Sequence, residues 1–193
     1  IYKNTIGNKV IFEEINHDLN IEFSYQWSSS NKYGFVRKSS IKNNSNNDLD
    51  INLLDGIQNI LPYGVGEGLQ IAQSNLVDAY KKCELENKSK LGIFTLSAII
   101  VDKAEPSEAL KANVVWSLGL NNPKYLVSSL QLSNFRKKQK VTSENDIKGE
   151  KGAYFINSDL VLNSNSKKEW MFVANVNQDH SDIVQIIELI KTD

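Results

Sequence analysis

The chain has 193 residues, of which 40% are hydrophobic and 23% are charged, so it can bury a sizeable core and has the composition of a globular domain. Its 22 Lys and Arg residues nearly balance its 23 Asp and Glu residues, which leaves a formal charge of -1. Nucleic-acid binders and proteins of anionic membrane surfaces carry net positive charge, so we expect neither partner.

The chain has too few cysteine and histidine residues for an intrachain disulfide or a typical zinc site. Cys83 is the only cysteine, so no intrachain disulfide can form, and with two histidines the chain cannot supply the usual Cys/His ligands of zinc. We therefore expect no metal and no cofactor. No run reaches the ~18 apolar residues of a membrane helix, and a cytoplasmic location is favoured. Because the chain does not begin with Met, we expect either a processed chain or a piece of a longer protein.

Alternation of apolar and polar residues dominates the chain. It is clearest over Leu19–Trp27, where every second residue is apolar, as in a strand with one buried and one wet face. Similar patterns predict further strands over Val10–Ile15, Phe35–Ile41, Leu49–Leu54, Gly92–Val101, Ala112–Leu120, Tyr125–Phe135, Ala153–Leu162 and Glu169–Val176.

Short polar turns separate these segments, which predicts antiparallel sheets rather than βαβ units. The continuous apolar run Gly92–Val101 is typical of a central strand covered on both faces, and this requires two stacked sheets. The predicted fold is mostly β: a large antiparallel two-sheet supersandwich with one internal helix and a C-terminal helix.

The two helices are predicted over Gly66–Lys82 and Asp179–Lys191, with Asp179 or Ser181 as the N-cap of the second. Val184 and Leu189 widen the apolar surface of the second helix beyond what one sheet requires. We therefore expect residues 1–178 to form the β-domain and residues 179–193 a linker helix that leads to a further, catalytic domain. The alternative, held equally, is that this helix caps one end of the sandwich.

The stretch from Asn43 to Gly68 resembles a phosphate loop only superficially. Gly64, Gly66 and Gly68 alternate before a helix, but neither the spacing nor the context of a dinucleotide or P-loop motif is present. We expect the asparagine tract to be the turn of a hairpin, Asp55-Gly56 to end its second strand, and the glycines to release the chain into the internal helix.

Candidate catalytic groups have simpler structural explanations. Asp102, Glu105 and Glu108 could pair as in a glycosidase, but an acidic loop containing Pro is usually solvated. Asp55 and Asp78 suit turn or helix-start hydrogen bonds. His17 and His180 could serve a mutarotase-like acid, yet both fit a turn and a helix start. We therefore expect no catalytic residue.

Aromatic residues are the natural sugar contacts, but Trp27, Trp116 and Trp170 lie on apolar strand faces, and core packing is favoured for Trp27 and Trp170. The predicted carbohydrate-contacting residues, expected at the surface, are Tyr33, Arg37, Tyr63 and Glu67. The basic segment Phe135–Lys140 is predicted to be a solvated hairpin.

Five segments carry a resemblance to a known family. They are FSYQWSSSNKYGFVRKSSIKN, LLDGIQNILPYGV, SNLVDAYKKCEL, AEPSEALKANVVWSLGL and KGEKGAYF. Together they resemble the N-terminal region of bacterial cellobiose-phosphorylase-like glycoside hydrolases. In that family a β-supersandwich related to galactose mutarotase precedes linker helices and a catalytic (α/α)-toroid.

The resemblance implies that this chain is a non-catalytic domain of a glycoside phosphorylase or hydrolase. Its expected partners are the C-terminal catalytic domain of the same polypeptide and an oligosaccharide, and a homodimer is compatible with it. Two alternatives remain open: a free-standing carbohydrate-binding module and an aldose-epimerase-type enzyme.

Overall fold

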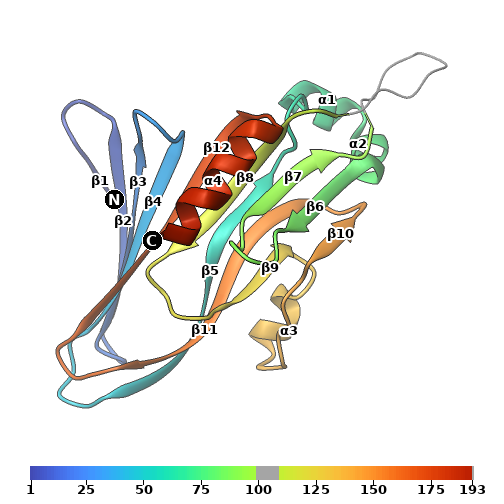
Figure 1. Ribbon diagram of the computed structural model, residues 1–193. Helices are drawn as coiled ribbons and strands as arrows, with labels where there is room; N and C mark the ends of the chain where they lie inside the picture. Colours follow the sequence, from blue (N-terminus) through green and yellow to red (C-terminus); the bar gives the residue numbers. More distant parts are fainter. Residues whose placement is uncertain (99–108, 193) are drawn as a thin grey trace. The chain divides into compact units, whose positions relative to one another are not determined.

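The computed structural model describes residues 1–98 and 109–192, which form twelve strands and four helices (Figure 1). The strands are β1 (Tyr2–Lys3), β2 (Lys9–Asn16), β3 (Ile21–Ser29), β4 (Phe35–Asn43), β5 (Leu49–Ile60), β6 (Lys81–Leu85), β7 (Gly92–Leu96), β8 (Ala112–Leu118), β9 (Lys124–Ser128), β10 (Asp146–Lys148), β11 (Gly152–Leu162) and β12 (Lys167–Gln178). The helices are α1 (Glu67–Ala72), α2 (Ser74–Tyr80), α3 (Leu132–Arg136) and α4 (His180–Thr192).

The strands form two antiparallel sheets, with the orders β1-β2-β3-β4-β12-β8-β7-β6-β10 and β5-β11-β9. Strands hold 49% of the residues and helices 17%, so the predicted mostly β, two-sheet architecture with a C-terminal helix is confirmed. The described residues contain three internal helices where one was predicted.

The chain forms two compact units, each assembled from distant segments. Unit 1 contains Ile1–Leu54, Ser117–Pro123 and Asn157–Ala174. Unit 2 contains Asp55–Trp116, Lys124–Ile156 and Asn175–Asp193. The long strands β5, β11 and β12 each contribute residues to both units.

In unit 1, β2, β3, β4 and β12 lie side by side (Figure 1). One face of this sheet carries aromatic rings: Phe12 stacks on Tyr25 with centroids 4.9 Å apart, and Phe23 stacks on Trp170 at 6.2 Å. Trp170 is 2% exposed, so its predicted place in the core is confirmed.

The asparagine tract does not form the predicted hairpin, because β4 and β5 belong to different sheets. Asn43, which is fully buried, instead stabilises the connection between β4 and β5. Its amide nitrogen donates to the carbonyl oxygens of Asn47 (2.7 Å), Leu162 (3.1 Å) and Asn163 (3.1 Å), and its side-chain oxygen accepts from Ser45. A satisfied buried amide thus holds two segments of unit 1 together, residues 43–47 and residues 162–163.

Asp55 and Gly56 do not end a strand as predicted, because β5 continues through them to Ile60. A Cβ atom on Gly56 would collide with the backbone oxygen of Tyr154 and with Phe155 on the adjacent β11. The glycine is therefore needed for close approach of two strands rather than for a turn.

Reciprocal contacts between glycine and aromatic residues join the two sheets within unit 2. A Cβ atom on Gly92 of β7 would lie 2.6 Å from the Tyr154 ring of β11, and a Cβ on Gly152 of β11 would lie 2.8 Å from the Phe94 ring of β7. Tyr154 and Phe94 are both fully buried, and the Tyr154 hydroxyl donates to the Lys90 carbonyl at 2.8 Å. The predicted stacking of two sheets is thus present around β7. This strand ends at Leu96, before the predicted end at Val101.

The segment predicted as one helix over Gly66–Lys82 is broken at Gln73, whose φ of -136° and ψ of 40° are not helical. The break shifts the helical phase, so that Val77 is buried while Leu76 is 45% exposed. Val77 packs with Val65 and Leu96, and the chain enters β6 at Lys81.

The strand predicted over Tyr125–Phe135 ends at Ser128, and the basic segment after it closes α3 instead of forming a hairpin. Lys138, at a φ of 56°, donates its N–H to the Phe135 carbonyl, which is a common way to end a helix. Glu144, 7% exposed, holds this region: its carboxylate accepts hydrogen bonds from the backbone of Val127 and Ser128 and from the Gln131 amide.

The C-terminal helix α4 begins with a reciprocal cap. The Asp182 N–H donates to the Asp179 carboxylate at 3.0 Å, and the Asp179 N–H donates to the Asp182 carboxylate at 3.1 Å. Asp179 is therefore the N-cap, which is one of the two residues predicted for this position. No helix among the described residues combines the length and apolar character needed to cross a membrane.

Candidate functional site

The predicted sugar contacts fall in both units. In unit 1, the backbone of Tyr33 bonds the Ser30 hydroxyl in a turn, and the Lys32 ammonium lies 5.0 Å from the Tyr33 ring centre. Arg37 was expected at the surface, but it is only 6% exposed, with its guanidinium 4.3 Å from the Tyr25 ring centre. Packing of the guanidinium on aromatic rings explains why this arginine turns inward.

Tyr63 and Glu67 lie in unit 2. Tyr63 is 42% exposed, and the Lys111 ammonium lies 5.4 Å from its ring centre. Glu67 is the first residue of α1, is exposed, and lines a cavity of about 350 Å³. Of the four predicted residues, Glu67 is the one that the structure places on a concave surface of unit 2.

We call this concavity the Lys81 cavity. Its apolar wall consists of Ile60, Leu61 and Ile71, and its polar lining consists of Asn59, Glu67, Gln70, Lys81 and Lys151. Its volume lies near the lower end of the range for small-molecule sites, which are mostly apolar with a few placed polar groups.

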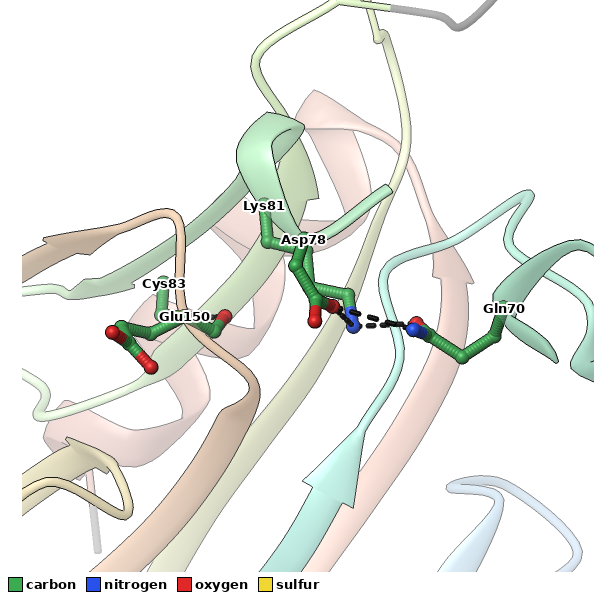
Figure 2. Close-up of polar contacts among 5 residues, drawn as sticks. All are labelled: Gln70, Asp78, Lys81, Cys83 and Glu150. Carbon is green, nitrogen blue, oxygen red and sulfur yellow. Dashed lines mark hydrogen bonds and ion pairs between the residues drawn. The ribbon is translucent and has the colours of Figure 1, made fainter. Parts of the chain in front are cut away.

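Lys81 is the buried charge of the cavity, at 2% exposure. Figure 2 shows its ammonium between the Asp78 carboxylate, 2.7 Å away, and the Gln70 side-chain oxygen, 2.6 Å away. The Gln70 amide also donates to Asp78 at 3.3 Å. An ammonium has three N–H donors, and these contacts use two of them.

Asp78 remains ionised because of its partners. Burial alone would raise the pKa of Asp78, but the hydrogen bonds from Lys81 and Gln70 and the charges of Lys81 and Lys151 together lower it. Asp78 is therefore a carboxylate near neutral pH, where its charge balances that of Lys81. The ion pair also ties α2 to the start of β6 within unit 2.

Lys151 and Glu67 complete the charge balance of the cavity. Both are exposed, they carry opposite charges, and neither forms an ion pair with a described residue. With Lys81 neutralised by Asp78, the lining has no net charge. Such a site presents several donors and acceptors without selecting an ion, which suits an uncharged, hydroxyl-rich ligand.

Cys83 and Glu150 lie beside this network (Figure 2). The Cys83 thiol lies 3.9 Å from the Glu150 carbonyl oxygen, and burial raises the pKa of Cys83 to about 12. Because the thiolate is the nucleophile, burial disfavours reaction at Cys83, which lies in the core.

The candidate catalytic groups lie at structural positions. His17 lies in the turn after β2, and His180 is the first residue of α4, as expected. Asp55 lies inside β5 and is 8% exposed. Asp102, Glu105 and Glu108 fall outside the described residues. Within residues 1–98 and 109–192, no three His, Cys, Asp or Glu side chains gather as metal ligands would.

Sequence reasoning missed four polar residues of the cavity: Asn59, Gln70, Lys81 and Lys151. The sequence held one indication of the site. Lys81 lies on the same buried face of β6 as Cys83 and Leu85, and lysine is rarely buried. The other three come from segments whose convergence depends on the fold.

Comparisons with known proteins do not identify the chain: it matches no family model, and no characterised protein aligns with it significantly.

Proposed function

We propose that this chain is a non-catalytic, carbohydrate-contacting β-domain of a larger carbohydrate-active enzyme, either a glycoside phosphorylase or a hydrolase. In this proposal it shapes the substrate cleft and packs on a helical catalytic domain of the same polypeptide. The observation that carries the proposal is the convergence of three family-like segments on the Lys81 cavity.

The convergence follows from the lining residues. Asn59, Ile60 and Leu61 come from LLDGIQNILPYGV, and Lys81 comes from SNLVDAYKKCEL. Lys151 comes from KGEKGAYF. Five of the eight lining residues thus come from segments with the family resemblance, while Glu67, Gln70 and Ile71 come from the stretch between two of these segments.

The chemistry of the cavity supports a sugar as the ligand. Hydroxyl groups both donate and accept hydrogen bonds, and the cavity offers ammonium and amide donors together with amide and carboxylate acceptors. Hydrogen bonds to charged groups are about twice as strong as neutral ones, which compensates for removing sugar hydroxyls from water. The apolar wall of Ile60, Leu61 and Ile71 suits the C–H face of a sugar ring.

The proposed linker role of α4 is supported by its side chains. Ile186 is 5% exposed and anchors the helix within unit 2, whereas Val184 is 41% exposed. In the proposal, this remaining apolar surface contacts the helical catalytic domain.

Calorimetric titration with cellobiose and D-glucose tests the proposal. We expect measurable binding to the wild-type chain and about a tenfold loss of affinity in Lys151→Gln, the size of one charge-assisted hydrogen bond. Lys148→Gln is the matched control, because Lys148 is also exposed but pairs with Asp146 and does not line the cavity. Absence of saccharide binding, or equal losses in both variants, would contradict the proposal.

The two rival functions predict different results in a binding titration and in an activity assay. A free-standing binding module would bind oligosaccharides at micromolar strength, whereas the proposed domain would bind them more weakly on its own. An aldose epimerase would interconvert sugar anomers and would lose that activity in His17→Ala or His180→Ala. We expect the isolated chain to show no turnover.

A further inference from the structure

A second concavity, on the sheet of unit 1, has a different charge balance. Strand register places Ser24 beside Ser40 and Ser40 beside Glu169, and the next row along the strands runs through Ile11, Gln26, Lys38 and Met171. The two serines are much smaller than the residues in the next row, so the sheet is hollowed there. The resulting groove, which we call the serine groove, has a volume of about 470 Å³.

The floor of the groove presents hydroxyl groups. The Ser24 and Ser40 oxygens lie 2.9 Å apart, so one hydroxyl donates to the other and the second retains its own proton for a further acceptor. The Gln26 side chain, in the next row, adds an amide that can both donate and accept. These groups match the hydroxyls of a polyol.

The charges of the groove do not cancel. Glu169 pairs with Lys167 at 2.6 Å, and the hydrogen bond and charge of Lys167, helped by the charge of Lys38, lower the pKa of Glu169. Lys38 lines the same groove, is exposed, and forms no ion pair with a described residue. One positive charge is therefore left over, beside the hydroxyl floor.

Nearby carboxylates do not remove this surplus. Glu13 of β2 lies opposite Ser24 of β3 but does not line the groove. Its carboxylate accepts a hydrogen bond from the Tyr2 hydroxyl. In the row on the other side of the serines, Glu22 lies opposite Lys42, which is a balanced pair of charges.

We propose that the serine groove binds a hydroxylated carboxylate of the uronic-acid type, with its carboxylate on Lys38 and its hydroxyls on Ser24, Ser40 and Gln26. The ligand class follows from one unpaired ammonium next to a row of neutral donors and acceptors. The inference does not depend on the Lys81 cavity, because the groove belongs to unit 1 and is tested by different variants.

NMR titrations with D-glucuronate, D-glucose and acetate test this assignment. We expect D-glucuronate to bind more tightly than either of the others, since D-glucose lacks the carboxylate and acetate lacks the hydroxyls. Lys38→Gln should weaken D-glucuronate binding about tenfold and leave D-glucose binding unchanged.

The matched control is Lys42→Gln, which removes the same charge from the same face of the same strand but outside the groove. It should leave D-glucuronate affinity within about twofold of wild type, because an exposed charge outside the site acts only through screened, longer-range attraction. If both variants weakened D-glucuronate binding equally, the attraction would be a general effect of positive charge rather than a contact in the groove, and this result would overturn the proposal. So would D-glucuronate binding no tighter than D-glucose, or acetate binding as tightly as D-glucuronate.

Discussion

At the scale of single residues, buried polar side chains hold loops that the sequence pattern leaves undefined. Asn43 does so in unit 1, and Glu144 and Lys81 do so in unit 2, each through hydrogen bonds to segments distant in the chain or on neighbouring elements. Burial of a polar group is costly unless hydrogen bonds replace those it made with water, so each of these residues depends on its partners.

The ion pair of Asp78 and Lys81 makes stability depend on pH. Because the folded state lowers the pKa of Asp78, the ionised carboxylate stabilises the fold above its ordinary pKa of 3.8. This stabilisation is lost as the pH falls through the lowered value in the folded state. We expect Asp78→Asn to lose less free energy of unfolding than wild type between neutral pH and a pH of about 3, measured by urea denaturation. Parallel pH profiles for the two proteins would show that Asp78 has no such role.

Residues of this kind were only partly predictable. Asp179 as a cap could be predicted because the signal is local, four residues at the start of a helix. Asn43 and Glu144 could not, because their partners lie on other segments. Arg37 was expected at the surface, and its packing on Tyr25 becomes visible only once β3 and β4 are paired.

At the scale of secondary-structure elements, alternation identified the strands, but close contacts between elements set their ends and bends. Apolar alternation placed β2, β3 and β4 to within two residues at each end. Gly56 was taken for a turn because Asp-Gly is a common turn pair, whereas the structure uses this glycine for close approach to β11. The break between α1 and α2 was hidden because Leu76 and Val77 are both apolar, so either phase was plausible.

The glycine contacts of β7 and β11 give a direct test of sheet stacking in unit 2. Gly92→Ala should reduce the free energy of unfolding by about 1–3 kcal/mol, because the added methyl group meets the fully buried Tyr154 ring. Gly68→Ala is the contrast: no atom lies within 4 Å of its added Cβ, and it lies in α1. This second variant should be neutral or stabilising by up to about 1 kcal/mol, since alanine favours helix. Equal destabilisation in urea titrations would argue against the packing described.

At the scale of the whole molecule, the net charge of -1 conceals two sites with different electrostatics. The Lys81 cavity of unit 2 has a balanced lining, and the serine groove of unit 1 has one surplus cation. The alternation of apolar and polar residues correctly indicated a mostly β protein, but it carried no information on either site, because both are made by residues that the fold brings together. The proposed sugar-contacting role therefore depends on the three segments that converge at Lys81.

The most direct test of that role is an NMR titration of the isotope-labelled chain with cellobiose. We predict that the backbone amides of Asn59, Glu67, Gln70 and Lys81 shift progressively and saturate together, because these residues line one cavity. A spectrum unchanged at high cellobiose concentration, or shifts confined to unit 1, would contradict the assignment of the Lys81 cavity as a carbohydrate contact.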